Sequence, residues 1–476
     1  PSAATVNRLA LRSAVELTQR TRQKRRANID SFDLLTQCVP SHRLMSAHAS
    51  LNGKMTAEGP RRSTTQGRAN MPEGNAGQKS LTPSPGIEFV PVEPNISAAY
   101  FEREREHIFK HVWLKIGRVE ELPRPGDYVV RDLAILQTSL LLVRGPDGVI
   151  RAFHNICRHR GNRLVSPCAG SAQHFFCGFH GWTYDAHGRL THVPQEEEFG
   201  ALSKDQFGLV QIPLDTWEGF IFINLDPAPT ETLQEYLGEV GDLVRGYPFE
   251  QMELAGRWTA EIAANWKTFQ DAFVEGYHVG TVHRRSIPDY RKNPLKAGIR
   301  TFGRHSNLTF YLDLGHEPRP AEAWAFKAGA LAFLQSGASD GARGKRPVGL
   351  NREQKPNWIF DEFLIFPHFH LFLGDGWVLC HDFWPVTVDR TDWTVSYYLA
   401  KTDNPVVKIA QEYSKVTMRD TIREDLSTIE NTHAAHRSGV LSHMVVSSEL
   451  EGLIAHHHRV VASYVEGTES EFRRGA

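Results

Sequence analysis

Two short cysteine–histidine pairs, Cys157-Arg158-His159 and Cys177-Gly178-Phe179-His180, decide the organisation of this 476-residue chain. Each pair places a thiolate and an imidazole in one short loop. Two thiolates can hold one iron of a [2Fe–2S] cluster while two imidazoles hold the other. Because each loop carries one donor of each kind, both loops can give one ligand to each iron. The pattern therefore predicts a cluster held by Cys157, His159, Cys177 and His180.

Zinc is the competing metal, because it also accepts two cysteines and two histidines. In zinc fingers, however, each half-site donates a like pair, first Cys-Cys and then His-His. Here the order is Cys-His in both loops. A mixed-ligand cluster of the Rieske type is therefore favoured, with zinc or four buried structural residues as the alternatives. Cys168 lies between the pairs, and we interpret it as an inert residue rather than a spare ligand.

The composition is that of a globular chain without the signature of a nucleic-acid-binding or membrane protein. Its length suits two or three domains, and 41% of its residues are hydrophobic. The net charge of −1 creates no field that favours nucleic acid or an anionic membrane, and no run approaches the length of a spanning helix. Five scattered cysteines argue against a disulfide framework. We therefore expect a cytoplasmic protein that binds neither nucleic acid nor membrane.

Residues 1–85 differ from the rest, because they are rich in Arg, Ser, Thr, Asn and Gly and include the basic run 20–26. Such a segment cannot bury enough apolar surface to offset the entropy of ordering, so we predict a disordered basic N-terminal extension. A transit peptide would have a similar composition. Because the chain opens on Pro, we favour an upstream extension or a non-native leader.

Short β-type runs surround the cluster loops. A helix is expected at about 98–113, within an N-terminal helical segment at 86–113 that packs on the C-terminal domain. The runs that follow are bounded by turn residues, which indicates an all-β domain at 114–228. The expected strands are Tyr128–Arg131, Ala134–Gln137, Leu140–Arg144, Val149–His154 and Gly219–Leu225.

Residues 229–476 read instead as an α+β domain, because long helical patterns stand beside a run of antiparallel strands. Residues 315–356 are expected to form a loose loop over its core. The helical patterns cover 231–244, 265–280, 405–436 and 448–465, and the strand patterns cover 357–366, 368–373, 376–386 and 391–401.

A second metal site is suggested by His278 and His283. On an unbroken helix, five residues turn about 500°, which leaves the two rings about 140° out of phase. They can share a metal only where the helix bends or ends between them, and Gly280 is a candidate bend. Two histidines alone are a weak signal.

The third ligand is predicted from the helical pattern at 405–436. At 100° per residue, Asp425 lies about 20° from Met418, inside the apolar stripe, whereas Asp420, Glu424 and Glu430 fall on the solvated side. A carboxylate in a buried stripe is costly unless it is paired or binds a metal. Two histidines and one carboxylate form the facial triad that non-haem iron enzymes use. A buried salt bridge to an arginine is the alternative.

With these residues in hand, the chain resembles the alpha (oxygenase) subunits of the Rieske non-haem iron oxygenases, the ring-hydroxylating family. The resemblance covers about residues 88–465. It implies an all-β Rieske domain followed by a helix-grip (START/Bet v 1-like) catalytic domain with an antiparallel sheet and a long C-terminal helix. The motifs that carry it are residues 157–161, 177–184, 265–267 (Asn-Trp-Lys), 275–278 with His283, and Glu424-Asp425.

The resemblance also implies cofactors and partners. The cofactors are a Rieske [2Fe–2S] cluster, a mononuclear Fe(II) held by His278, His283 and Asp425, and O2 as co-substrate. Electrons would come from NAD(P)H through a separate reductase or ferredoxin. The implied assembly is a ring-shaped homotrimer, with or without a beta subunit, in which one subunit's cluster serves the next subunit's iron.

Two positions depart from the family pattern. Many members carry Asp three residues before the first iron histidine, where it bridges to a cluster histidine across the subunit interface. Here that residue is Glu275, which lies near the His278 face of a helix, so we expect the bridge to survive with a longer arm. A plain surface Glu is the alternative. The Gln that often follows the iron Asp by eight residues is His433 here, to which we assign no role.

The expected function is that of a terminal oxygenase that hydroxylates a small aromatic or other hydrophobic substrate, by cis-dihydroxylation or monooxygenation. Oxidative demethylation would use the same iron chemistry. A Rieske electron-transfer protein fused to a ligand-binding domain is the alternative of a different class, and it would not need the His278–His283–Asp425 triad. The residues considered as pocket walls are Phe269, Phe273, Val279, Phe310 and Phe366.

Overall fold

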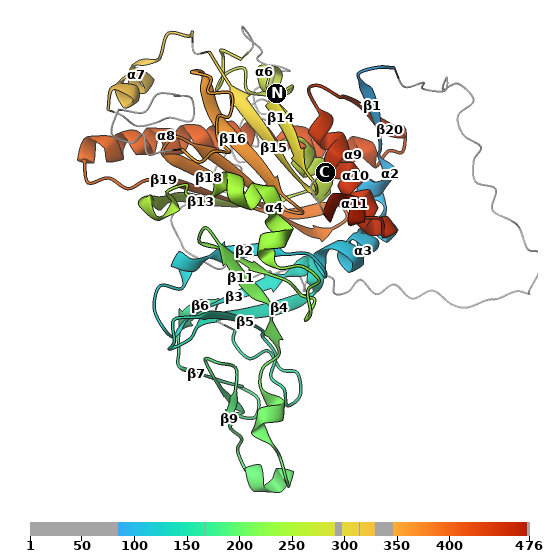
Figure 1. The fold of residues 1–476 in the computed structure, drawn as a ribbon, viewed down its shortest axis with the longest axis vertical. Helices are drawn as coiled ribbons and strands as arrows, with labels where there is room; N and C mark the ends of the chain where they lie inside the picture. The colour runs from blue at the N-terminus through green and yellow to red at the C-terminus, as the bar shows by residue number, and fades with distance from the viewer. Residues whose placement is uncertain (1–83, 167, 291–297, 314, 329–345, 474–476) are drawn as a thin grey trace, which may run out of the picture.

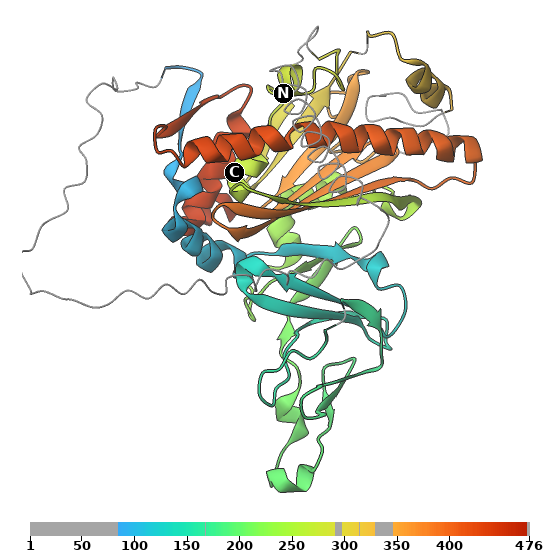
Figure 2. The same ribbon diagram turned by 180° about the vertical axis from the view of Figure 1, so that it is seen from behind.

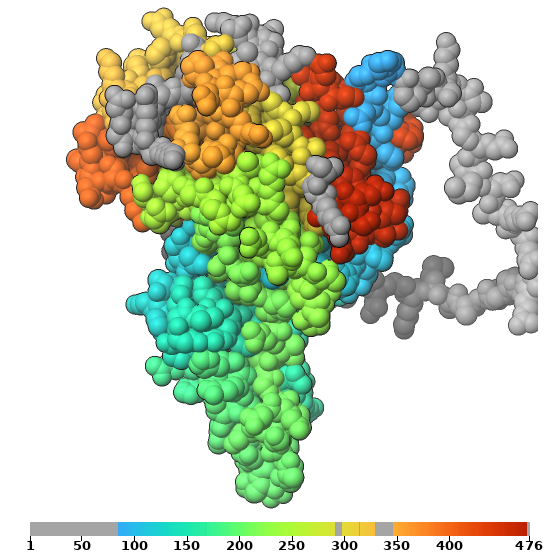
Figure 3. Space-filling model, in the orientation of Figure 1, coloured from blue at the N-terminus to red at the C-terminus, as the bar shows by residue number. Residues whose placement is uncertain are grey.

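The computed structural model describes residues 84–166, 168–290, 298–313, 315–328 and 346–473. Almost all of the predicted disordered extension at 1–85 therefore lies outside the described residues. The described chain has a broad body built on a seven-stranded sheet and a narrow protrusion formed by part of its N-terminal half (Figures 1 and 3). The outer part of the protrusion carries the short strands that surround the cluster loops.

The first described segment is tied to the end of the chain. Strand β1 (Ile87–Pro91) pairs antiparallel with β20 (His443–Ser447), and helices α2 (Glu93–Ile96) and α3 (Ala98–Glu104) follow. The Ser97 hydroxyl accepts a hydrogen bond from the backbone N–H of Tyr100 and caps α3. A π-helical turn at Arg105–Phe109 extends α3, so the helix expected at 98–113 ends four residues early. This segment packs against α10 (Gly452–Glu466) of the body.

The protrusion consists of three small antiparallel sheets. They have the strand orders β10-β5-β4-β3-β6, β7-β8-β9 and β11-β12-β2. The strands are β2 (Leu114–Arg118), β3 (Asp127–Leu133), β4 (Thr138–Arg144), β5 (Ile150–His154), β6 (Ala169–Ser171), β7 (His174–Phe176), β8 (Thr183–Asp185), β9 (Leu190–His192), β10 (Gln211–Ile212), β11 (Leu214–Trp217) and β12 (Phe220–Ile223). Short 3₁₀ turns lie at Val119–Glu121, Ala134–Leu136, Glu196–Phe199 and Lys204–Phe207.

One expected strand of the protrusion is wrong. Ala134–Gln137 forms a 3₁₀ turn, because Gln137 adopts a left-handed conformation with φ of 50° and reverses the chain between β3 and β4. A run of apolar residues predicts burial, and both Ile135 and Leu136 are buried. It does not by itself distinguish a strand from a buried turn.

The body is organised by a seven-stranded antiparallel sheet with the order β13-β19-β18-β17-β16-β15-β14. Four of its strands follow the expected ranges closely, namely β16 (Trp358–Ile365), β17 (Phe369–Gly374), β18 (Trp377–Thr387) and β19 (Arg390–Ala400). The other three were not predicted from the sequence, namely β13 (Met252–Ile262), β14 (Gly298–Phe302) and β15 (His305–Tyr311). Preceding these are α4 (Leu233–Val244) and a 3₁₀ turn at Phe249–Gln251.

Both long helical patterns near the expected metal ligands are interrupted. The pattern at 265–280 is divided into α5 (Trp266–Asp271) and α6 (Val279–Val282). The pattern at 405–436 is divided at Asp425 into α8 (Pro405–Glu424) and α9 (Leu426–His436), which cross the sheet one after the other (Figure 2). The remaining helices are α7 (Pro320–Lys327), inside the segment expected to be a loop, and α11 (Ser470–Arg473).

The architecture is α+β, with β-rich sheets in the protrusion and a helix-covered antiparallel sheet in the body, as expected. The protrusion has a hydrophobic core of its own, which includes Val130, Phe153 and Tyr184. Among the described residues, none of the helices is long and apolar enough to cross a membrane.

Candidate metal centres and the adjoining pocket

The two cluster loops fold in the same way. In the first, the Cys157 N–H donates to the Asn162 carbonyl at 2.8 Å, and the Gly161 N–H donates back to the Cys157 carbonyl at 3.0 Å. In the second, Cys177 N–H donates to Trp182 and Gly181 N–H to Cys177, at 2.8 and 2.9 Å. Gly161 and Gly181 have φ angles of 76° and 75°, which an L side chain rarely adopts. Each loop therefore presents its Cys and His from the same hydrogen-bonded turn.

The four expected donors are gathered where these loops meet. The rings of His159 and His180 have centroids 4.6 Å apart, and the buried thiols of Cys157 and Cys177 interact with each other. The buried Nδ1 of His159 has no hydrogen-bond partner among the described residues. Two thiols beside two imidazoles are the donor set of a Rieske [2Fe–2S] cluster, so the residues present fit this group.

Neighbouring side chains hydrogen-bond to the sulfur atoms. The Tyr184 hydroxyl lies 3.4 Å from Cys157 Sγ and accepts a 3.0 Å hydrogen bond from the Arg158 N–H. The Asn162 amide donates to Cys177 Sγ at 3.6 Å. Burial opposes ionisation of Cys177, but the N–H groups of the loop lower the pKa of its thiol. These contacts stabilise thiolates, which is the form that binds iron.

Two aromatic residues of the second motif lie beside the donors. Trp182 stacks on His159, with centroids 4.9 Å apart and planes 8° apart. Trp182 thus fixes the orientation of this ring, while Tyr184 contacts sulfur. Cys168 is disulfide-bonded and is therefore not a spare ligand, as expected.

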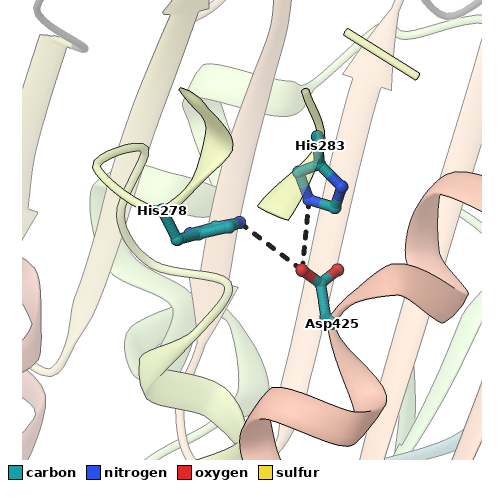
Figure 4. Close-up of side chains that lie close together, drawn as sticks. All are labelled: His278, His283 and Asp425. Carbon is teal, nitrogen blue, oxygen red and sulfur yellow. Dashed lines mark ion pairs between the residues drawn. The ribbon is translucent and has the colours of Figure 1, made fainter. Parts of the chain in front are cut away.

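The second set of expected ligands comes together in the body. His278, His283 and Asp425 offer ligand atoms that all lie within 4.8 Å of one another. Nε2 of His283 is 3.1 Å and Nε2 of His278 is 3.6 Å from Oδ1 of Asp425 (Figure 4). The three residues come from the start of α6, its end, and the break between α8 and α9. Two imidazoles and one carboxylate match the donor set of a facial iron triad.

The two histidines flank one short helix, and the bend predicted at Gly280 is wrong, because Gly280 lies inside α6. His278 precedes α6 and His283 follows it, so the short helix turns the chain between the two rings, whose centroids are 5.2 Å apart. Asp425 occupies the junction where α8 stops and α9 starts. It is buried, as the apolar stripe at 405–436 predicts.

A second carboxylate holds each histidine by the nitrogen that faces away from Asp425. Glu275 Oε1 lies 2.5 Å from Nδ1 of His278, and Glu424 Oε2 lies 2.9 Å from Nδ1 of His283. Such contacts fix the tautomer and leave Nε2 of each ring available to a metal. Burial lowers the pKa of His278, but the adjacent Glu275 overcomes this effect and raises it.

Glu424 was wrongly placed on the solvated side of its helix. Its Oε2 also accepts a 2.7 Å hydrogen bond from the Ser286 hydroxyl, so it joins α8 to the segment after α6. The helical angle itself holds, because Glu424 and Met418 both belong to α8. The angle does not report that the segment after α6 lies against this side of the helix and brings His283 and Ser286 to the carboxylate. Asp420 is exposed, and Glu430 accepts a hydrogen bond from the Ala263 N–H.

The triad opens onto a pocket inside the body, with about 570 Å³ of empty space, including the part open to solvent. Its walls are mostly apolar. Phe273, Val279 and Phe310, considered as walls from the sequence, line the pocket, whereas Phe269 and Phe366 do not. The other apolar lining residues are Ala272, Ile287, Leu308, Phe360, Phe372, Leu379, Met418 and Ile422.

Three polar side chains of this pocket were not foreseen: Glu362, His381 and Thr421. Glu362 Oε1 lies 2.6 Å from Nδ1 of the buried His370. Neither ring nitrogen of His381 has a hydrogen-bond partner among the described residues, and neither has the Thr421 hydroxyl. Burial, and then Glu275, raises the pKa of Glu362 well above its usual value, while burial lowers the pKa of His381 to about 3. The sequence feature that could have revealed Glu362 is the pair Asp361-Glu362 inside an otherwise apolar strand.

Two family models match the chain. The Rieske [2Fe–2S] domain matches residues 112–214, and the catalytic domain of the ring-hydroxylating alpha subunit matches residues 249–467. The first match contains both cluster loops, and the second contains the triad and its pocket. Both cofactors expected from the sequence, the Rieske cluster and the mononuclear iron, are the groups that these two domains carry.

Curated relatives share about a third of the residues over part of their length. The carnitine monooxygenase oxygenase subunit of Escherichia coli (strain K12) is 35% identical over 184 residues, which cover 38% of this chain and 49% of the relative. The naphthalene 1,2-dioxygenase large component of Pseudomonas aeruginosa is 39% identical over 196 residues, or 39% of this chain and 42% of the relative. The chain thus spans half or less of the length of these relatives in the matched segments.

Solved structures show the same fold. The quaternary ammonium Rieske monooxygenase CntA with L-carnitine superposes with a TM-score of 0.62 at 22% identity, covering 80% of this chain and 96% of that one. Naphthalene 1,2-dioxygenase from Rhodococcus sp. with indole gives a TM-score of 0.62 at 23% identity, covering 80% and 94%. Together with the two matched domains and their donor sets, this identifies the chain as a member of the Rieske non-haem iron, ring-hydroxylating oxygenase family, of the alpha-subunit type.

Proposed function

We propose that this chain is a terminal oxygenase that hydroxylates a small, mainly apolar organic substrate in the pocket beside His278, His283 and Asp425. The observation that carries the proposal is that these three side chains open together onto an apolar pocket. A Rieske electron carrier fused to a ligand-binding domain would have no need of the triad. In this proposal, Cys157, His159, Cys177 and His180 hold the Rieske cluster, and the triad holds Fe(II).

When bound, the cluster supplies single electrons and the ferrous ion activates O2 at its open positions. The chain itself supplies orientation and exclusion of water. Glu275 and Glu424 hold the two imidazoles from behind, and the phenylalanine walls keep the substrate in a dry space against the triad. The same arrangement serves cis-dihydroxylation, monooxygenation or oxidative demethylation.

Electron supply is proposed to come from a separate reductase or ferredoxin that uses NAD(P)H. Within one chain, the cluster loops lie in the protrusion, and α6 with the triad lies towards the opposite end of the body (Figure 1). This separation supports a homotrimeric ring in which the cluster of one subunit serves the triad of the next, with or without a beta subunit. A cytoplasmic location is part of the same proposal.

Glu275 is proposed to lie at that subunit junction. It is buried, and its carboxylate accepts hydrogen bonds from the backbone N–H groups of Tyr277 and His278 besides holding the His278 ring. Tyr277 beside it is exposed. We expect Glu275→Gln to keep both metals and to slow product formation in a single turnover. An unchanged single-turnover rate would remove Glu275 from the proposed junction.

The division of the chain is likewise proposed. Residues 1–85 are an extension, 86–113 an N-terminal segment, 114–228 the Rieske domain and 229–476 the catalytic domain. A separate hydrophobic cluster around the two cluster loops supports a Rieske unit, whereas the sheet β11-β12-β2 shares the hydrophobic cluster of the body.

Metal and product analysis tests the function. The oxygenase should contain three irons for every two acid-labile sulfides, whereas a carrier fused to a ligand-binding domain should contain two. Incubation with ¹⁸O2 and a donor system should place labelled oxygen in the product from a panel of aromatic hydrocarbons, methyl ethers and amines. Two irons per two sulfides with no labelled product would favour the carrier instead.

A further inference from the structure

The floor of the pocket is a row of side chains that crosses the sheet, and one member of this row carries a carboxylate among apolar neighbours. Leu308, Glu362, Phe372 and Leu379 are cross-strand neighbours on β15, β16, β17 and β18, and all four line the pocket. Three are apolar and the fourth is a carboxylate. Phe360, two residues before Glu362, lines the pocket from the same face of β16.

A carboxyl group at this place is costly. Glu362 is 2% exposed, and His370, its neighbour on β17, is fully buried. Replacing a buried pair of this kind by apolar residues is often neutral or stabilising, so packing alone gives no reason for it. The other two carboxylates at the pocket belong to the metal site, because Glu275 holds His278 and Asp425 is part of the triad. Glu362 is therefore the acidic side chain of the pocket that does not belong to the metal site.

No positive side chain balances this acidity. Among the described residues, no lysine or arginine lines the pocket. An anionic substrate would find no counter-charge in its walls, whereas a cation would find Glu362 and aromatic faces. The rings of Phe310 and Phe360 stack 5.0 Å apart, and Phe372 lies 5.5 Å from Phe360. Aromatic faces attract organic cations, most strongly where water is excluded.

Unpartnered polar atoms beside the same pocket point to a polar ligand. His381 is fully buried with both ring nitrogens unpaired, and the Thr421 hydroxyl is buried and unpaired, among the described residues. His381 lies against Phe273 and Phe372 of the wall, with centroids 4.9 and 5.0 Å apart. Buried polar groups without partners are uncommon unless a ligand or water satisfies them.

We infer that the pocket takes an organic ammonium compound with an apolar body, whose positive nitrogen lies against Glu362 and the phenylalanine faces. This inference rests on the proposed function, since it names the substrate class of the same pocket. Glu362 is a specificity-determining residue here, and the triad faces the carbon skeleton rather than the charge. Organic anions such as aromatic carboxylates are excluded by the same carboxyl group.

Binding to the metal-loaded enzyme without O2 tests the inference independently of turnover. The probes are phenyltrimethylammonium, its neutral isostere tert-butylbenzene, and benzoate, with affinities measured by calorimetry or thermal shift. The cation should bind at least about tenfold more tightly than the isostere, and benzoate should not bind measurably. Equal affinities for cation and isostere, or tight binding of benzoate, would overturn the inference even if the oxygenase activity is real.

A pair of variants separates specificity from stability. Glu362→Gln should lower the cation-to-isostere ratio severalfold, to the part that the phenylalanine faces supply, while leaving isostere binding unchanged. Glu322→Gln is the matched control, because Glu322 is also a buried carboxylate, 3.0 Å from Nε2 of His316, but does not line the pocket. It should keep the wild-type ratio. If Glu362→Gln keeps the wild-type ratio, the contact of Glu362 with His370 has a structural role only, and the inference is refuted. If this variant does not fold, the wild-type ratio alone decides.

Discussion

The protrusion and the body each gather metal ligands, but they do so over very different lengths of chain. All four cluster donors lie within residues 157–180, in two loops with the same pattern of backbone hydrogen bonds. In the body, His283 and the carboxylate that orients it are 141 positions apart, and the triad depends on two interrupted helices. A local turn is enough to place the cluster donors, whereas the triad requires the whole body to be folded.

This difference affects how each site responds to change. The cluster loops belong to a hydrophobic core of their own, so damage to the body leaves their turns in place. The triad is sensitive to any shift of α8 against the segment that carries α6, because one helix junction supplies Asp425 and Glu424 together. Variants of single residues can therefore separate the two sites.

The largest expected effect comes from Asp425→Ala. This change removes the carboxylate from the triad and leaves the protrusion untouched, so product formation should fall by more than about a hundredfold while the visible spectrum of the cluster stays unchanged. Product assays and absorption spectra on the same sample check both parts. Full activity would show that the carboxylate does not hold the catalytic metal.

A smaller effect is expected from Glu424→Gln. The amide keeps the size of the side chain but loses the charge that orients His283, and such changes typically cost about 10-fold or more in metal affinity or activity. Titration of the stripped enzyme with Fe(II) measures the loss. Arg423→Gln on the neighbouring exposed position is the control and should bind iron as the wild type does. If both variants bind Fe(II) with the same affinity, the contact of Glu424 with His283 does not contribute to iron binding.

The pH dependence of cation binding tests whether Glu362 at the pocket wall carries the charge that the cation meets. Because the pKa of Glu362 is raised, its carboxyl is protonated below that pKa and gains charge as the pH rises. Affinity for phenyltrimethylammonium should therefore increase with pH, by up to about tenfold per unit below the pKa, and tert-butylbenzene binding should stay constant. Of the groups facing Glu362, burial keeps His370 and His381 neutral by lowering their pKa values, and Glu275 is held by His278. A flat profile for the cation would contradict this assignment.

The smallest effect is expected in the protrusion, from Tyr184→Phe. Removing the hydroxyl takes away one hydrogen bond to Cys157 Sγ, which should lower the reduction potential of the cluster by tens of millivolts, roughly the worth of one hydrogen bond. Spectroelectrochemistry measures the potential, and iron binding at the triad should not change. A potential equal to that of the wild type would mean that Tyr184 only packs against the cluster loops.

Sequence reasoning succeeded where the determinants are local. The spacing of Cys157, His159, Cys177 and His180 predicts their meeting because each turn closes on itself through backbone hydrogen bonds. The strands β16 to β19 were also predicted closely, because long apolar runs bounded by turn residues describe buried strands well.

Prediction from the sequence failed where a contact joins distant segments or where a strand shows no hydrophobic period. Glu424 was assigned to the solvated side because its helical angle does not reveal that the segment after α6 lies against that side and brings His283 and Ser286 to its carboxylate. The strand β13 is half exposed and mixes charged with apolar residues, so its pattern resembled a loop. Glu362 was overlooked because the adjacent carboxylates Asp361 and Glu362 point to opposite faces of the strand, and the sequence does not say which face lines a pocket.

Glu424, next to Asp425 in the chain, affects how the enzyme loses and regains its metal ion, because it holds a histidine ring of the triad. The outer nitrogens of His278 and His283 are held by Glu275 and Glu424, not by any metal, so a chelator that strips the ion leaves both rings anchored. A returning ion then meets donors that are already aligned and need little reordering. Reconstitution of stripped protein with fresh ferrous salt should consequently be rapid and complete, without a refolding step.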